Sequence, residues 1–430
     1  VHRAMMAPAR RAALDALRLI DERHLDLGAA LAQVREHLHD ERDHALLLEL
    51  VAGTLRMRAA VDYQIASRVK RPLARLDAAV LRILRLGAFQ LLYLSRLPVS
   101  AVISDAVDLT RRSGKTSAAG LANAVLRALA RDRDQLSWPD RGDLVTHLST
   151  VHSHPAWLVE RWVARYGPDE TERWLQFNNT AASMCLAVNR HLTDRDRLAE
   201  ALRAQDVDTD PTARARDGLV VRSGRPLATA LFKDGHFVVQ DEASQLIAEL
   251  AAAESGARVL DLCASPGGKS VSLSVGRRVV VACDVRTNRV RLLQRTLRRC
   301  RVDHARIVHV PGTGPLPFHE AAFDVVLIDA PCSGLGTVRR DPDIRWRRTA
   351  EDLPAFAAAQ RALVERAAGL VRPGGALVYA TCSSEPEEND EVIAASLAEL
   401  PAFSLERRHH TLPFSDGLEA FFGAVLRRAL

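Results

Sequence analysis

The stretch DLCASPGGKS, residues 261–270, decides how the second half of this 430-residue chain folds. It begins inside RVLDL, an apolar run typical of a buried strand, and its glycine-rich turn leads into a predicted helix. The turn is neither G-x-G-x-x-G nor G-x-x-x-x-G-K-[ST], which disfavours a dinucleotide or nucleoside triphosphate site. A turn of this kind still lets a nucleoside-type ligand approach the backbone. The sequence therefore predicts a ligand site at the end of this strand.

Further strand candidates alternate with helical segments after Gln240. They read RVVVACD (278–284), ARIVHV (305–310), FDVVLIDA (323–330) and GALVYATC (375–382). Their apolar runs suit strands that are buried on both faces. The alternation predicts an α/β Rossmann-like domain, a doubly wound parallel sheet covered by helices.

Side chains able to carry chemistry follow four of these strands, namely Asp261, Asp284, Asp329 with Cys332, and Cys382. Asp284 stands 23 positions after Asp261, where an acid accepts ribose hydroxyls in dinucleotide-binding sheets. Either acid taken alone is equally compatible with a structural role. Because the carboxyl ends of parallel strands share one crevice, we expect these five residues to converge.

Cysteine usage and apolar patterning constrain the compartment. The six cysteines form no C-x-x-C pair, which favours neither a disulfide framework nor a zinc site. We interpret Cys185, Cys283 and Cys300 as inert buried residues, and we expect no metal. No run of about 18 apolar residues occurs, and the first residues mix both charge signs. We therefore expect a cytoplasmic protein with no membrane span.

Helical periodicity runs from Ala9 to about Ala130 and predicts five to seven helices in a compact all-α domain. Between Arg56 and Arg85, eight basic residues stand against two aspartates, a local excess of +6 that equals the net charge of the whole chain. This stretch either follows phosphates or is an ordinary solvated surface. The second interpretation has weight because arginine is enriched throughout the chain: only four of the 59 basic residues are lysine. A local cluster of arginines is therefore weak evidence for RNA binding.

We expect three domains: 1–138 helical, 150–235 a small α+β linking segment, and 236–430 catalytic. Two further arginine-rich stretches are candidate RNA contacts. Residues 277–306 hold ten arginines against two aspartates, and VRRDPDIRWRR (338–348) adds a tryptophan that suits stacking on a flipped base. The second stretch is also compatible with an ordinary helix-capping loop.

Four motifs carry a family resemblance. In order and spacing, DLCASPGGKS, DAPCSG, RRDPDIRW and VYATCSSEPEEN resemble those of the Sun-type bacterial 16S ribosomal RNA cytosine-C5 methyltransferases, which use S-adenosylmethionine. The helical stretch, with ELVAGTLR and LANAVLRAL, resembles the NusB-like RNA-binding domain of that family. The resemblance covers nearly the whole chain. It implies an enzyme that methylates 16S rRNA, and we expect this enzyme to be a monomer.

The resemblance also implies roles for individual residues. Cytosine C5 is a weak nucleophile, so a thiolate adds to C6 first; the family's attacking cysteine is Cys382 here. Cys332 is implied in product release, and Asp329 in contacts with the methyl donor and the polar edge of the base. The implied cofactor-binding residues are Cys263, Ala264, Ser265, Pro266, Gly267, Gly268, Lys269, Asp284, Arg289 and Asp329.

Two positions depart from the family pattern. Ser265 replaces the usual second alanine of CAAPGGK, which we expect to be tolerated. At the end of the third strand, the family's adenine-binding aspartate aligns with Pro311, which has neither a carboxylate nor an N–H. Two alternatives therefore stay open: the same chemistry on another RNA, such as a tRNA or another rRNA cytidine, and a weakened domain that acts as an assembly factor.

Overall fold

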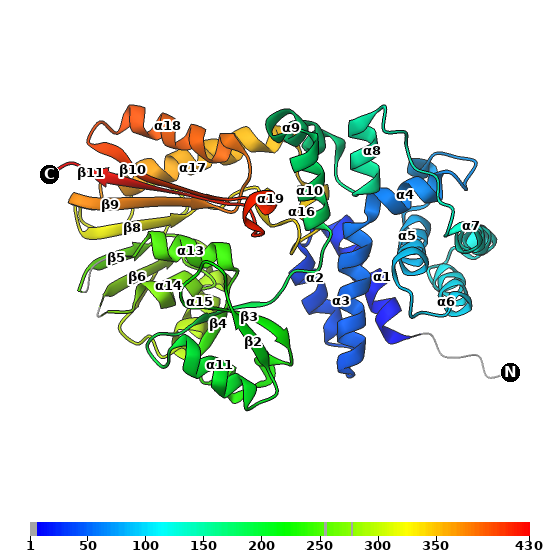
Figure 1. Cartoon of the computed structure of the whole chain (residues 1–430), viewed down its shortest axis with the longest axis horizontal. Helices are drawn as coiled ribbons and strands as arrows, with labels where there is room; N and C mark the ends of the chain where they lie inside the picture. Colours follow the sequence, from blue (N-terminus) through cyan, green and yellow to red (C-terminus); the bar gives the residue numbers. More distant parts are fainter. Residues whose placement is uncertain (1–6, 253–255, 277) are drawn as a thin grey trace. The chain divides into compact units, whose positions relative to one another are not determined.

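The computed structural model describes residues 7–252, 256–276 and 278–430, which fall into two compact units (Figure 1). The first unit comprises Val1–Thr180 together with Val338–Ala350, and the second comprises Ala181–Thr337 with Glu351–Leu430. The chain thus leaves the second unit after Thr337 and returns to it at Glu351. Within the described residues, no helix is both long and apolar enough to cross a bilayer.

The first unit is built of helices. They are α1 (Pro8–Arg23), α2 (Leu27–Arg35), α3 (Glu41–Arg56), α4 (Arg58–Ala66), α5 (Ala78–Tyr93), α6 (Val99–Arg112), α7 (Ala119–Asp132), α8 (Leu144–Val151), α9 (Ala156–Tyr166), α10 (Pro168–Asn178) and the short α16 (Ile344–Arg347). The expected helical N-terminal domain is confirmed, and α1–α7 reach the upper end of the predicted number.

Apolar side chains at helical spacing explain how these helices pack. Helix α5 starts at Asp77, whose carboxylate accepts hydrogen bonds from the first-turn amides, and it buries Ile83, Leu84 and Phe89. A Cβ on Gly53 of α3 would lie 2.0 Å from the ring of Phe89, so only glycine lets these two helices approach so closely. In α9 and α10, the rings of Trp162 and Trp174 stack with centroids 4.2 Å apart.

The basic stretch of residues 56–85 does not form one continuous exposed face, which corrects the expectation. Arg85 binds Asp62 through two hydrogen bonds, and Arg82 is buried against Glu22. Arg68 pairs with Asp132. Helix packing uses these side chains internally, and the exposed basic residues of the stretch are Lys70, Arg71 and Arg75.

The second unit holds two sheets. The smaller, with strand order β2-β3-β1-β4, is antiparallel in the described residues and is followed in the chain by the larger sheet. Its elements are β1 (Cys185–Val188), α11 (Arg195–Arg203), β2 (Asp208–Pro211), β3 (Gly218–Ser223), α12 (Ala230–Lys233) and β4 (Phe237–Val239). Leu186, Leu198 and Phe237 lie in its apolar core.

The larger sheet has the order β10-β11-β9-β8-β5-β6-β7 in the described part of the chain. Its elements are α13 (Glu242–Leu250), β5 (Arg258–Asp261), α14 (Gly268–Leu273), β6 (Val279–Asp284), α15 (Thr287–Arg299), β7 (Arg306–His309), β8 (Phe323–Asp329), α17 (Leu353–Ala368), β9 (Val371–Thr381), α18 (Asp390–Glu399), β10 (Phe403–Thr411), α19 (Pro413–Asp416) and β11 (Phe421–Arg428). The five predicted strands are present and parallel, and the Rossmann-like fold class is confirmed.

The sheet is mixed and not wholly parallel, because β11 pairs antiparallel with β9, and β10 with β11. Both strands were missed in the sequence. Apolar residues alternate across the sheet: Val325 and Leu327 of β8 pack with the core that includes residues of α13–α15, while Val326 and Ile328 pack with the core on the side of α17 and α18. Helices therefore cover both faces, and the polar strand ends are left at the edge.

Candidate functional site

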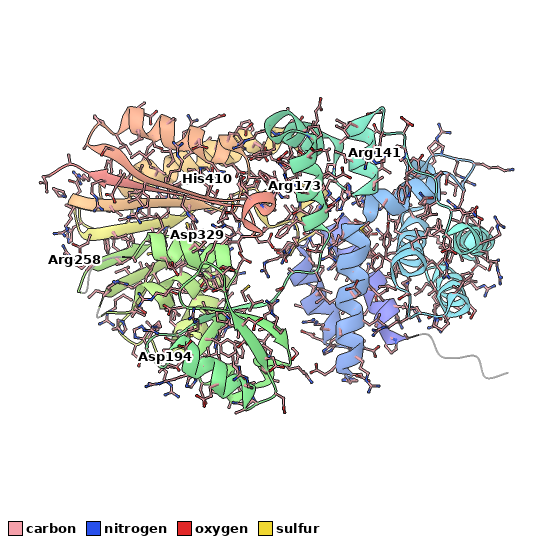
Figure 2. All side chains as sticks on the ribbon, viewed as in Figure 1. Arg141, Arg173, Asp194, Arg258, Asp329 and His410 are labelled. Carbon is pink, nitrogen blue, oxygen red and sulfur yellow. The ribbon has the colours of Figure 1, made fainter. Side chains whose placement is uncertain are left out.

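Four neighbouring strands of the larger sheet end in the residues that the sequence singled out. Asp261, Asp284 and Asp329 are the last residues of β5, β6 and β8, and Cys382 follows Thr381, the last residue of β9. Because these strands are parallel and adjacent in the sheet, their carboxyl ends lie along one edge. Figure 2 labels Asp329 at this edge.

Backbone hydrogen bonds hold the turn after β5 across its neighbours. The amide of Leu262 donates to the carbonyl of Leu327 in β8, and the amide of Ala264 donates to that of Cys283 in β6. Gly267 then adopts a φ of +109°, a conformation that favours glycine, and Gly268 opens α14. The turn is thereby fixed to both flanking strands.

Lys269, on the first turn of α14, is nearly buried and has two partners. Its Nζ lies 2.7 Å from Asp329 Oδ2 and 2.7 Å from Ser244 Oγ. The ammonium therefore joins the turn after β5 to the end of β8. It is a compact donor in a place where a branched guanidinium would need more room.

The end of β6 is organised by an ion pair. Arg289 Nε lies 3.2 Å from Asp284 Oδ2, and Arg289 Nη2 donates to the carbonyl of Ser265 at 2.7 Å. The amide of Arg286 donates to Asp284 Oδ1. One arginine thus connects the acid of β6 with the glycine-rich turn.

Burial controls the electrostatics of this edge. Asp261 is fully buried, and burial raises its pKa to about 7; a hydrogen bond from Ser270 opposes this rise, and the charge of Asp329 adds to it. Burial and the same carboxylate raise the pKa of Cys263 well above that of a free thiol. Cys263 is therefore a neutral packing residue in this environment.

The two predicted catalytic cysteines lie side by side. Cys332 Sγ is 3.3 Å from Cys382 Sγ, although 50 residues separate them in the chain. The hydrogen bond to Cys382 and burial raise the pKa of Cys332 well above the ordinary thiol value, and the charge of Glu388 acts in the same direction. Either sulfur can be the donor in this contact.

One group that supports both cysteine loops was not predicted from the sequence. Glu388, in a short 3₁₀ turn before α18, is fully buried and accepts hydrogen bonds from Ser333 and Ser383, each of which directly follows one of the cysteines. The available signal was an acidic residue in EPEEN, close behind the second cysteine. Nothing in the local pattern indicated that this carboxylate would be buried.

Glycine is required where the two loops meet at Gly336. Its amide donates to the carbonyl of Cys382 at 2.9 Å, and its carbonyl accepts from the amide of Ala420 at 3.0 Å. A Cβ at this position would lie 2.0 Å from the carbonyl oxygen of Ala420. A side chain at position 336 would therefore displace backbone next to Cys382.

The segment 338–350 is not the exposed RNA-facing loop that its composition predicted. Arg345 is fully buried in the first unit, and its guanidinium donates to the carbonyls of Ser153 at 3.0 Å and Asn178 at 3.3 Å. The indole N–H of Trp346 donates to the carbonyl of Leu55 at 2.6 Å, and Arg58 lies over its ring. Both side chains are occupied within the protein, so stacking of Trp346 on an RNA base is not supported.

The other arginine-rich stretch remains available on the surface. Arg286, Arg291, Arg295, Arg298 and Arg301 are exposed on and around α15, and no ion pair to any of them occurs among the described residues. Arg277, which belonged to the predicted stretch, lies outside the described residues. Helix α15 therefore presents a basic face beside the strand edge that bears Asp284.

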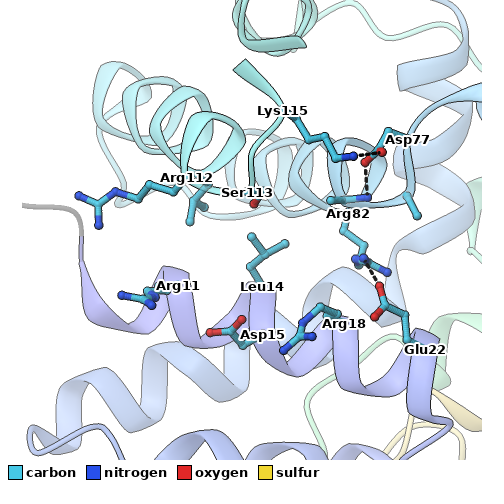
Figure 3. Close-up of a pocket in the computed structure, with 13 residues that line it drawn as sticks. Arg11, Leu14, Asp15, Arg18, Glu22, Asp77, Arg82, Arg112, Ser113 and Lys115 are labelled. Carbon is cyan, nitrogen blue, oxygen red and sulfur yellow. Dashed lines mark hydrogen bonds and ion pairs between the residues drawn. The ribbon is translucent and has the colours of Figure 1, made fainter. Parts of the chain in front are cut away.

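A separate cavity of about 630 Å³ lies in the first unit (Figure 3). It is lined by charges of both signs, including Arg11, Asp15, Arg18 and Arg112. Two ion pairs, Lys115 with Asp77 and Arg82 with Glu22, occupy its wall. The cavity contains no cysteine, and its opposing charges give it no single electrostatic preference.

The strand edge suits the cofactor that the resemblance implies. Three buried polar atoms around the glycine-rich turn have no hydrogen-bond partner among the described residues: Asp261 Oδ1, Ser265 Oγ and Gln240 Oε1. The two other carboxylates at the edge are ion-paired, Asp329 with Lys269 and Asp284 with Arg289. No group of three or more histidine, cysteine or acidic side chains in the described chain is arranged to hold a metal ion.

Comparisons with known proteins assign the chain to a family. Residues 248–423 match the model for the 16S rRNA methyltransferase RsmB/F, residues 7–131 match the NusB family, and residues 154–228 match the ferredoxin-like domain of RsmF/B-like methyltransferases. The solved structure of the protein PH0851 superimposes with a TM-score of 0.83 over 99% of both chains, at 24% identity. This likeness supports the fold.

Two curated relatives extend the match over whole chains. The probable ribosomal RNA small subunit methyltransferase B of Bacillus subtilis is 33% identical over 410 residues, 90% of this chain and 91% of the relative. The ribosomal RNA small subunit methyltransferase B of Vibrio vulnificus is 32% identical over 427 residues, 97% of this chain and 98% of the relative. From its motifs, its fold and these matches, the chain belongs to the RsmB/F family of 16S rRNA methyltransferases.

Proposed function

We propose that this protein transfers a methyl group from S-adenosylmethionine to C5 of a cytidine in 16S rRNA through a covalent bond between Cys382 and C6. The observation that carries the proposal is the 3.3 Å contact between the sulfurs of Cys332 and Cys382 at the ends of adjacent strands. Two thiols in contact at a ligand-binding edge suit a reaction with separate attack and release steps.

The roles of the two thiols follow from the different environments of their sulfurs. We assign the proton of this contact to Cys332, whose pKa is raised, and the attack on C6 to Cys382, which reacts as a thiolate. Addition of that thiolate to C6 moves electron density to C5, which then takes the methyl group. In the release step the C5 proton passes to solvent water, its bonding electrons restore the aromatic ring, and the C6–S bond breaks so that the Cys382 sulfur leaves as a thiolate. We assign assistance of this step to Cys332, whose thiol lies 3.3 Å from the departing sulfur and can donate a hydrogen bond to it.

Asp329 is the proposed contact to the base. It ends β8 three residues before Cys332, and its Oδ2 is held by Lys269. A carboxyl group in this position accepts a hydrogen bond from the exocyclic amine of cytosine. The amine distinguishes cytosine from uracil, so this contact favours cytosine as the target base.

The residues around the glycine-rich turn fit S-adenosylmethionine, which supplies an electrophilic methyl group when bound. We assign its binding to residues 263–269, with Asp284 accepting the ribose hydroxyls, Arg289 holding Asp284, and Asp329 at the methionine side. Asp261 keeps one buried oxygen free of partners among the described residues. Pro311 offers no carboxylate for the adenine, so we expect weaker binding than in relatives with an aspartate there.

We propose 16S rRNA as the substrate because the matching family model is that of a 16S rRNA methyltransferase, the curated relatives are named as small subunit ribosomal RNA methyltransferases, and the helical unit matches the NusB family. A cytoplasmic monomer acting on the small subunit is the corresponding cellular form. The exposed arginines of α15 are the proposed contacts to RNA phosphates. In the sequence, they follow the proposed cofactor residue Asp284.

The decisive experiment is methyl transfer from labelled S-adenosylmethionine to 16S rRNA by the full chain and two variants. We expect Cys382→Ala to abolish transfer, and Cys332→Ala to accumulate an enzyme–RNA adduct on a denaturing gel. Bisulfite sequencing then locates the modified cytidine. Transfer by Cys382→Ala at the wild-type rate, or an adduct formed by that variant, would refute the assigned roles. Transfer only to tRNA would refute the substrate, and cofactor binding without transfer to any RNA would indicate an assembly factor.

A further inference from the structure

The Pro386–Asn389 segment contains a carboxylate that is more deeply buried than its sequence suggests. Glu388 has no exposed surface, and no basic side chain forms an ion pair with it among the described residues. A buried charge without a counter-ion is costly unless hydrogen bonds replace its lost hydration. The contacts of Glu388 meet this requirement.

Four donors from three separate segments are directed at the carboxylate. Oε1 accepts from the amide of Ser333 at 2.7 Å and from Gln360 Nε2 of α17 at 3.0 Å. Oε2 accepts from Ser333 Oγ at 2.5 Å and from Ser383 Oγ. Four donors stabilise the charged form of a carboxylate, and one side chain here connects the loops after β8 and β9 with a helix.

The segment around Glu388 is itself fixed to the end of β9. The hydroxyl of Tyr379 donates to the carbonyl of Glu388 at 2.6 Å. Asn389 accepts from Thr381 Oγ1 at 2.5 Å and donates to the carbonyl of Ser383 at 3.0 Å. The carboxylate is therefore held by a rigid frame and cannot follow the cysteine loops if they move apart.

A repeated dipeptide in the sequence gains a physical reason from this arrangement. Both cysteines are followed by serine, in Cys332-Ser333 and Cys382-Ser383, and both serines bind the same carboxylate oxygen. Each serine thus anchors the cysteine that precedes it. With both anchors on one group, the separation of the two sulfurs is fixed by Glu388.

We propose that Glu388 is a positioning residue for the methyl transfer proposed above: its carboxylate clamps the two cysteine loops together and favours the proton on the sulfur of Cys332. The role in catalysis rests on that proposed function, whereas the clamping of the two loops rests on the hydrogen bonds of Glu388. The negative charge lies close enough to contribute to the raised pKa of Cys332, after the effects of Cys382 and burial. A clamp and a charge are separable properties, because different substitutions remove them.

The first test needs neither RNA nor cofactor. In a Cys382→Ser background, the rate at which iodoacetamide alkylates Cys332 is measured against pH by mass spectrometry. We expect Glu388→Gln, which removes the charge and keeps the shape, to lower the pH midpoint by about half a unit or more. A looser loop would raise the plateau rate and leave the midpoint in place. Glu391→Gln, the same chemical change at an exposed position of α18, is the matched control.

The second test uses the full chain with RNA. Glu388→Asp keeps the charge, but its side chain is one methylene too short to reach both loops. We expect its pH midpoint of Cys332 alkylation to equal that of the wild type. We expect its kcat to be lower by about tenfold or more, with KM little changed. Glu388→Gln should shift the pH dependence of adduct release. Unchanged midpoint and kcat in both variants would overturn the proposal. If the wild-type chain transfers no methyl group, the proposed function fails, while the alkylation midpoint still tests Glu388.

Discussion

Replacing Arg345 with methionine tests how the thirteen residues 338–350 are held in the first unit. The guanidinium donates to the carbonyls of Ser153, Asn178 and Val338 and to the side chain of Asn179, at 3.0–3.3 Å. A buried acceptor left without its donor costs about 1–3 kcal/mol, and removal of a buried charge without a carboxylate partner offsets part of that sum. We expect the first unit to lose about 3–5 kcal/mol of unfolding free energy.

Tryptophan fluorescence in urea measures this loss in the intact chain. All five tryptophans, at positions 138, 157, 162, 174 and 346, belong to the first unit, so their signal follows that unit even though the whole protein is not two-state. With a slope of about 2 kcal/mol per molar urea, the midpoint should fall by about 1.5–2.5 M.

A matched arginine tests whether the effect belongs to burial. Arg127→Met changes an exposed side chain of α7 that donates a hydrogen bond to Asn123, and we expect a change within about 0.5 kcal/mol. Arg345→Lys should recover only part of the loss, because a single ammonium cannot reach acceptors on both sides. If the urea midpoint of Arg345→Met equals that of Arg127→Met, the reasoning is refuted. The hydrogen bonds of Arg345 would then contribute no net stability to the first unit.

Three further predictions concern the second unit. Gly336→Ala should abolish methyl transfer and lower the free energy of unfolding by about 2 kcal/mol or more, because its Cβ would lie 2.0 Å from the Ala420 carbonyl oxygen. Gly312→Ala is the control, since a Cβ there meets open space. Wild-type activity in Gly336→Ala would contradict the packing argument. Burial raises the pKa of Asp261 to about 7 from about 3.9 in an unfolded chain, so the stability contributed by its protonated form is lost as the pH rises through 7. Asp261→Asn should therefore have the same free energy of unfolding as the wild type near pH 4, and a free energy of unfolding up to about 4 kcal/mol higher than the wild type at pH 8. Unfolding followed by circular dichroism at the two pH values measures the difference. Equal stability of the two proteins at pH 8 would show that the carboxyl group is not desolvated. Changing Arg291, Arg295 and Arg298 of α15 to glutamate should leave cofactor binding intact and make RNA affinity less dependent on salt. The slope of log affinity against log salt concentration, measured by fluorescence anisotropy, should become shallower by about 0.7–0.9 for each phosphate that is no longer neutralised. An unchanged slope would show that α15 is not part of the RNA interface.

Sequence alone determined the parts of this protein that depend on local pattern. Short stretches rich in apolar residues indicated the positions of β5 to β9, since a strand covered on both faces admits few polar residues. The convergence of Asp261, Asp284, Asp329 and the two cysteines followed from one rule, that parallel strands share their carboxyl ends. Strand β10 was missed because it is a largely exposed edge strand, FSLERRHHT, whose polar residues hide the pattern.

Tertiary structure decided which partner each charged side chain has. Trp346 and the arginines around it were candidate RNA contacts, yet Arg345 and Trp346 have partners as far as 166–291 positions away in the chain, in Asn179 and Leu55. Arg82 and Arg85 were candidate phosphate contacts, yet neighbouring helices supply their carboxylates. Glu388 was one acid among several in the sequence, and only the fold brings three segments to it. The physical reason is that a strand is recognised from its own residues, whereas the burial of a charge depends on donors and acceptors that the chain supplies from elsewhere.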